Sequence, residues 1–246
     1  MFNHRLDETP GQRVVLHWFL LCFSGGCINA GGFLATGRFV SHVTGFATLF
    51  GVDAVNLELD KAIGILSVPV FFLLGAFVAG MLIDRPVSRG EHPHFDWVMS
   101  LGAACLLAAA LGGMTLQFGG FGEAGLKQNY ILLALLCLAS GLQNAAITSS
   151  SGRSVRTTHL TGLTTDLGLG LARLMAFDLK KEGFMKEARA NWLRIGSIAS
   201  FVVGSAFGAG FFVRFGYKGF LLPAAISAYA AWNGRREKIV ARRLVV

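Results

Sequence analysis

The chain has 246 residues, of which 53% are hydrophobic and only 15% are charged, whereas an ordinary soluble domain carries roughly 25% charged residues. Its formal net charge is +8, but the basic residues lie mostly between and beyond apolar stretches. The retention of positively charged loops in the cytoplasm explains this placement better than nucleic-acid binding does. These values exclude an ordinary cytosolic enzyme, a secreted disulfide scaffold and a nucleic-acid binder, and they favour a multi-pass membrane protein.

Six uncharged stretches are predicted to cross a membrane, since a span needs roughly 20 predominantly apolar residues. In chain order they are 14–37, 62–83, 97–122, 128–152, 195–213 and the shorter 219–234. Residues 1–13 are predicted to be a cytoplasmic N-terminus and residues 235–246 a basic cytoplasmic tail. Trp18, Trp97 and Trp232 stand at the edges of these stretches, which predicts interfacial anchors.

Two further segments, 42–56 and 160–177, are long enough for a helix but marginal for a full crossing. The first contains Asp53, and the second contains Asp166 and Arg173. If both segments cross, the chain has eight spans. If both enter the membrane and return on the side they came from, it has six.

Short motifs that occur twice in the same order predict two homologous halves, at 14–117 and 128–234. Gly-Cys-Ile-Asn-Ala at 26–30 resembles Gly-Leu-Gln-Asn-Ala at 141–145, and Ser-His-Val-Thr-Gly at 41–45 resembles Thr-His-Leu-Thr-Gly at 158–162. The two offsets are 115 and 117 residues. A small-residue spacing then follows in each half, at Gly75 and Ala79 and at Gly204 and Gly208, and it predicts close helix packing.

The distribution of basic residues bears on how the halves face. With three spans in each half, the second half is inverted, and 17 basic residues fall inside against 5 outside. With eight spans the division is 15 against 7. The positive-inside rule therefore favours the inverted six-span arrangement with both termini in the cytoplasm, a plan that recurs in secondary transporters.

In each half an Asn near the end of a helix is followed by a loop and by His-x-Thr-Gly, which opens a new helix. The Thr hydroxyl could cap the first turn, and the Gly would let a ligand approach closely. A helix N-terminus at membrane depth presents unpaired N–H groups and a positive dipole end, which suits an anionic or carbonyl group. The predicted substrate-binding residues are Asn29, His42, Thr44, Gly45, Asn144, His159, Thr161, Gly162 and Asp166, with Asp166 as the acid that couples transport to an ion.

These residues also have structural interpretations, which the sequence leaves open. Thr-Gly could simply cap and pack a tight turn, the Asn side chains could join neighbouring helices, and the histidines could bond loop carbonyls. Asp53 could lie at the water-exposed end of its helix. Arg153 and Arg156 could gate an anion path or contact lipid phosphate, but the positive-inside rule alone explains them.

No motif for catalysis, metal binding or a cofactor stands out, so we expect a protein that is not an enzyme and holds no metal or cofactor. Nothing pairs a plausible base with a nucleophile. The four cysteines lie inside apolar runs without metal-ligand spacing and are predicted to be buried free thiols. They are Cys22, Cys27, Cys105 and Cys137.

The segments 39–45, 141–145 and 155–162, which carry the repeated motifs, resemble the YoaK-like bacterial membrane proteins. That family is known as a domain of unknown function, and the resemblance extends over nearly the whole chain. It implies a polytopic protein of the bacterial inner membrane with about six spans, and it implies no substrate. Phe46 stands where the family often has Asn, which argues against a polar role for that position here.

The expected fold is an all-α membrane bundle of two inverted three-span halves, with a re-entrant His-x-Thr-Gly helix in each. The expected function is a permease for a small solute, with anions among the candidates. The expected partners are membrane lipids, the solute and, through the small-residue seams, a second copy of the chain. The alternative is a non-transporting scaffold or lipid-binding protein of the membrane in which the repeated motifs only pack.

Overall fold

The computed structural model describes residues 11–56, 59–123, 126–152, 155–176 and 182–243, and in these residues all regular secondary structure is helical. The first half of the chain contains α1 (Gln12–Thr36), α2 (Val43–Val55), α3 (Leu59–Leu82), the short α4 (Asp84–Ser88) and α5 (Phe95–Met114). The second half contains α6 (Leu126–Ser150), α7 (Leu160–Ala176), α8 (Glu182–Phe215), the 3-10 turn η1 (Gly216–Phe220) and α9 (Leu221–Arg243).

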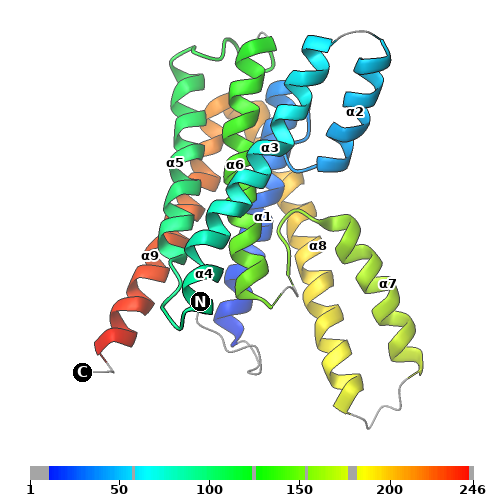
Figure 1. The fold of residues 1–246 in the computed structure, drawn as a ribbon, viewed down its shortest axis with the longest axis vertical. Helices are drawn as coiled ribbons and strands as arrows, with labels where there is room; N and C mark the ends of the chain where they lie inside the picture. Colours follow the sequence, from blue (N-terminus) through cyan, green and yellow to red (C-terminus); the bar gives the residue numbers. More distant parts are fainter. Residues whose placement is uncertain (1–10, 57–58, 124–125, 153–154, 177–181, 244–246) are drawn as a thin grey trace.

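The long helices α1, α3, α5, α6, α8 and α9 run side by side as a bundle (Figure 1). The shorter α2 and α7 lie on one flank of it, α2 against α3 and α7 against α8. Both begin near mid-height, and they run in opposite directions, α2 toward the upper end and α7 toward the lower end (Figure 1). The start of α1 and the end of α9 lie at the same lower end.

The helices have the length and composition of a multi-pass membrane protein. Five helical stretches of the described chain are long and apolar enough to cross a bilayer. They are Gln12–Thr36, Gly64–Ser88, Phe95–Met114, Tyr130–Ser150 and Gly183–Arg236, the last of which joins α8, η1 and α9 in 54 residues. Large apolar side chains such as Leu73, Phe77 and Val213 are 62–75% exposed on the outside of the bundle, where lipid rather than water would solvate them.

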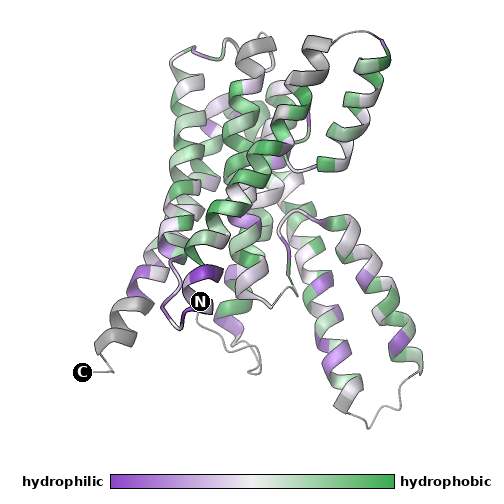
Figure 2. Cartoon of the chain, viewed as in Figure 1, coloured by the Kyte–Doolittle hydropathy of each residue, from purple (hydrophilic) through white to green (hydrophobic). Residues whose placement is uncertain are grey.

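Hydrophilic residues gather around α4 and the lower ends of α8 and α9, whereas the bundle above them is largely apolar (Figure 2). This distribution separates an apolar band from a polar lower end.

Two details of the sequence-based prediction are wrong, and one helix is longer than the span predicted within it. The apolar run predicted at 97–122 is not one helix, because α5 ends at Met114 and the chain turns at Leu116, whose φ is +61°. Helix α8 begins well before residue 195, because its charged first turns are rich in helix-forming Glu, Lys, Arg and Ala. Trp18 is buried in the core, unlike the half-exposed Trp97 and Trp232, so it is not an interfacial anchor.

Two helix crossings of the bundle use the repeated glycines. Where α1 crosses α8, a Cβ on Gly26 would overlap the carbonyl oxygen of Phe201, and a Cβ on Gly204 would overlap that of Phe23. The absence of side chains at both glycines lets the two backbones touch, as the small-residue spacing predicts.

The second crossing, of α3 with α6, repeats the first. A Cβ on Gly141 would overlap the carbonyl oxygen of Phe72, and a Cβ on Gly75 would overlap that of Leu138. The residues on α6 follow those on α1 by 115 positions, and those on α8 follow those on α3 by 129. The first helix of each half therefore packs against a helix of the other half, α1 against α8 and α6 against α3.

Adding one methyl group at either crossing is expected to destabilise the protein. We predict that Gly26→Ala and Gly141→Ala each cost about 1–3 kcal/mol, because the overlapping atoms are backbone and the helices must separate. The measurement is the thermal unfolding midpoint of the purified protein in detergent. Gly210→Ala on α8 is the control, since nothing lies within 4 Å of its Cβ, and alanine favours the helix. An equal loss in the control would contradict the crossing argument.

Candidate functional site

The segments that precede α2 and α7 reach the middle of the bundle. The thiol of Cys137, halfway along α6, donates to the carbonyl oxygen of Val40 at 2.8 Å. In the other half, the carbonyl oxygen of Thr157 lies 3.1 Å from the position of a Cβ on Gly25, halfway along α1. Each segment therefore lies against the midpoint of the other half's first helix.

Two cysteines make contacts between the segment of one half and the first helix of the other, and the sequence analysis missed this pair. Cys22 on α1 lies 3.9 Å from the carbonyl oxygen of Arg156, and Cys137 on α6 contacts Val40. The two cysteines are related by the offset of 115 residues, so that offset could have revealed them. All four cysteines are free thiols, and only Cys105 is less than fully buried.

The two predicted asparagines hold these segments to their own first helix. The Oδ1 atom of Asn29 accepts from the backbone N–H groups of Val40 and Ser41, at 3.2 and 3.4 Å, and from the Ser41 hydroxyl. The Oδ1 atom of Asn144 accepts from the N–H and the hydroxyl of Thr157, at 3.0 and 3.2 Å. The oxygens therefore satisfy loop backbone, while neither Nδ2 group has a hydrogen-bond partner among the described residues.

The predicted caps at Thr44 and Thr161 are wrong. Helix α2 has His42 as its N-cap, with no hydrogen bond from the side chain, and Thr44 is its second residue. Helix α7 begins at Leu160, so Thr161 is again the second residue. The chain leaves its extended path two residues earlier than expected, and a hydroxyl inside the first turn no longer faces the N–H groups that a cap would bind.

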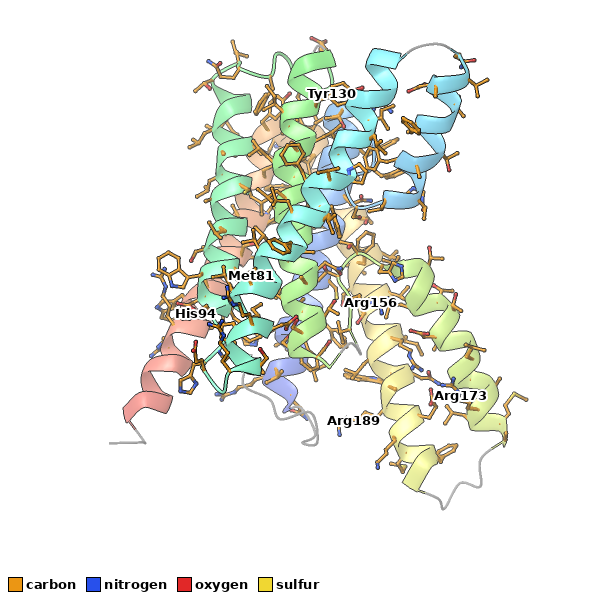
Figure 3. The ribbon with its side chains drawn as sticks, viewed as in Figure 1. Met81, His94, Tyr130, Arg156, Arg173 and Arg189 are labelled. Carbon is orange, nitrogen blue, oxygen red and sulfur yellow. The ribbon has the colours of Figure 1, made fainter. Side chains whose placement is uncertain are left out.

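Each histidine instead lies over the glycine of its motif. A Cβ on Gly45 would be 2.7 Å from Nδ1 of His42, and one on Gly162 would overlap the ring of His159. Arg156, in the segment that precedes α7 (Figure 3), lies 2.8 Å from Nδ1 of His159 through Nη1. Because a guanidinium can only donate, Nδ1 accepts and the ring proton is on Nε2.

The repeated motif is longer than the sequence analysis recognised. The hydroxyl of Thr48 donates to the carbonyl oxygen of Thr44 at 3.1 Å, and that of Thr165 donates to Thr161 at 3.0 Å. Both pairs follow the offset of 117 residues, which defines His-x-Thr-Gly-x-x-Thr as the repeated unit. Extending the alignment by three residues would have found it.

The predicted acid Asp166 does not lie at a helix start. It is exposed on α7, and its counterpart at the offset of 117 residues is Leu49. Asp53 is half-buried near the end of α2, and its counterpart is Gly170. Neither acid belongs to the repeated arrangement.

A polar cluster between α7 and α8 was also missed. Glu187 accepts from Arg194 at 2.8 Å and from Arg173 at 3.5 Å, and Arg194 also donates to Asn191 at 2.5 Å. Figure 3 shows Arg173 on the side of α7 that faces α8. Gly170 makes room for the cluster, because a Cβ there would overlap the Asn191 side chain. The cluster joins the lower part of α7 to α8.

A pocket of about 570 Å³ lies between the end of α1, the following loop and the first turns of α2. It is lined by Thr36, Gly37, Arg38, Phe39, His42, Gly45, Phe46, Thr48 and Leu49. The pocket thus brings two of the predicted site residues, His42 and Gly45, together with an arginine and two aromatic rings.

Residues 17–232 match the profile of one protein family, described as "Protein of unknown function (DUF1275)". The chain belongs to this family. The resemblance to the YoaK-like membrane proteins is thereby confirmed at the level of the family, whose description names no substrate. Comparison with curated proteins and with solved structures finds no match.

Removing the asparagine oxygens is expected to loosen the segments before α2 and α7. We predict that Asn29→Ala and Asn144→Ala each destabilise the protein by about 1–3 kcal/mol, because partly buried N–H groups lose their acceptor. Thermal unfolding in detergent measures the change. Asn56→Ala, at the exposed end of α2, should leave the midpoint within about 0.5 kcal/mol. If neither substitution changes the unfolding midpoint, the segments are held in another way.

Proposed function

We propose that the chain is an inverted-repeat permease of the bacterial inner membrane, with six crossings and two re-entrant elements. Its long helices α1, α3, α5, α6, α8 and α9 cross the bilayer, and α2 and α7 enter it and return. A small solute binds between the starts of α2 and α7. The family assignment is silent on transport, so the proposal rests on geometry.

One observation carries this proposal. Helices α2 and α7 begin near mid-height of the bundle and point to opposite ends (Figure 1). Broken backbone at membrane depth is tolerated where it is buried in protein or lines a cavity, and half-helix N-termini that point at a substrate are a known device of transporters. Equivalent contacts, from Asn29 and Asn144 and from Cys22 and Cys137, position both elements.

The charges support the orientation with both ends of the chain in the cytoplasm. Arg85 and Arg89 of the lower end are on the side where α1 starts and α9 ends, whereas Arg38 lies beyond the upper end of α1. The hydrophilic lower end in Figure 2 agrees with the positive-inside rule.

A non-transporting scaffold or lipid-binding protein is the second candidate. The observation in its favour is that the Oδ1 atoms of Asn29 and Asn144 are both used to satisfy the loops. In that case the repeated motifs serve only packing, and the starts of α2 and α7 bind nothing.

Topology is the first test of the permease. Ser88 and Gln117 are exposed at opposite ends of the bundle. In a variant with the native cysteines replaced by serine, Gln117→Cys should react with a membrane-impermeant maleimide on intact cells. Ser88→Cys should react only after permeabilisation. The reverse pattern would contradict the proposal, because it arises from eight spans in parallel halves or from six spans with both termini outside.

Transport is the second test. Proteoliposomes on a solid-supported membrane would receive concentration jumps of acetate, phosphate and benzenesulfonate, with protein-free liposomes as the blank. We expect a current with at least one anion and a loss of about tenfold or more in Gly45→Val and Gly162→Val, whose side chains would displace the histidine rings.

Gly51→Val and Gly168→Val are the matched controls for this experiment. They lie on the same two helices, they are related by the same offset, and nothing lies within 4 Å of a Cβ at either position. Currents that fall equally in the controls would contradict the assignment of the site. A protein of the expected topology that gives no current with any probe would favour the scaffold.

A further inference from the structure

The pocket beside α2 has the dimensions of a small-molecule site. Its volume of about 570 Å³ falls within the range of roughly 300–1,000 Å³ that is usual for ligand pockets. It is formed by one half of the chain only, from the last turn of α1 to the second turn of α2. The pocket can therefore be considered apart from the symmetry of the two halves.

Arg38 is the charged side chain of this pocket. It is half-buried, and among the described residues no carboxylate pairs with it. A partly buried guanidinium without a counter-charge is suited to bind an anion through charge-assisted hydrogen bonds. The lining contains no acidic residue that would repel the anion.

The remaining wall suits a flat apolar body. The ring of Phe39 stacks on Phe33 at a centroid distance of 4.6 Å and meets the ring of His42 edge-on at 6.0 Å. Phe46, which is buried, and Leu49, which is partly exposed, also line the pocket. Two phenylalanines and a leucine offer no hydrogen-bonding groups, so the part of a ligand that they contact should be apolar.

We infer that this pocket binds an organic monoanion, a carboxylate or sulfonate, with its charged group at Arg38 and an aromatic or planar apolar body between Phe39 and Phe46. The pocket includes the start of α2, which is one of the two helix ends of the proposed permease site, and only its role in transport rests on that function. Binding itself can be measured without transport.

The other half does not repeat this chemistry. At the offset of 117 residues, Val155 takes the place of Arg38 and is fully buried, and Asp166 takes the place of Leu49. Arg156 takes the place of Phe39, and its guanidinium already contacts His159. One binding site in each chain is therefore expected.

The test uses the purified full-length chain in detergent, with benzenesulfonate and benzoate as probes. Benzenesulfonamide is the neutral analogue, and inorganic sulfate is the anion without an apolar body. Both organic anions should raise the unfolding midpoint, and the neutral analogue and sulfate should raise it much less. Isothermal titration should give one site in each chain.

Arg38→Gln should weaken the binding of benzenesulfonate by about tenfold or more, because a charge-assisted contact is lost. Arg214→Gln is the matched control, since Arg214 is also a cation at the upper end and does not line the pocket. Its guanidinium lies over the ring of Phe215 instead. Binding should be unchanged in this control.

Several outcomes would overturn the inference. They are no shift with either organic anion, equal stabilisation by benzenesulfonamide, which would indicate an apolar pocket that lipid could fill, and equal weakening by Arg214→Gln. Binding that depends on Arg38 in a protein that carries no current would reject the permease and keep the pocket. Currents that do not depend on Arg38 would keep the permease and would exclude the pocket from its transport path.

Discussion

The extended segments before α2 and α7 bring backbone N–H and C=O groups into the middle of an apolar bundle, where water cannot satisfy them. Asn29 and Asn144 accept from the N–H groups, and Cys137 donates to a carbonyl from the opposite half. Because these bonds exist, the two segments can stop near mid-height, and α2 and α7 can begin there. The candidate site, the pocket and the proposed mechanism all depend on this arrangement.

The glycine crossings provide the second condition. Gly26 with Gly204 and Gly75 with Gly141 let the first helix of each half pack against the third segment of the other at backbone contact. The halves are thus interlocked rather than placed side by side, and neither forms its core alone. Helices α2 and α7 each contact mainly one long helix, so they are less constrained than the bundle.

The two halves share a framework but only some of its side chains. The contacts of Asn29 and Asn144, the glycine crossings and the His-x-Thr-Gly-x-x-Thr units recur at fixed offsets. Arg38 is not repeated, because its counterpart is Val155. The cluster around Glu187 has no equivalent either, since Arg194 corresponds to Ile65 on α3. Repetition therefore accounts for the shape of the site, and the differences account for its chemistry.

The sequence by itself determined the all-helical class, the family and the glycines at which helices pack closely, because hydropathy, motif order and small-residue spacing are local properties of the chain. It also singled out Asn29, His42 and Gly45, but it assigned the caps to Thr44 and Thr161 and an interfacial role to Trp18. Only the tertiary structure decided that the asparagine oxygens serve the loops, that cysteines of one half contact segments of the other, and that Arg38 lies beside Phe39 and Phe46. Each of these depends on how helices distant in sequence approach one another, and that approach is set by packing between the halves rather than by any pattern within one.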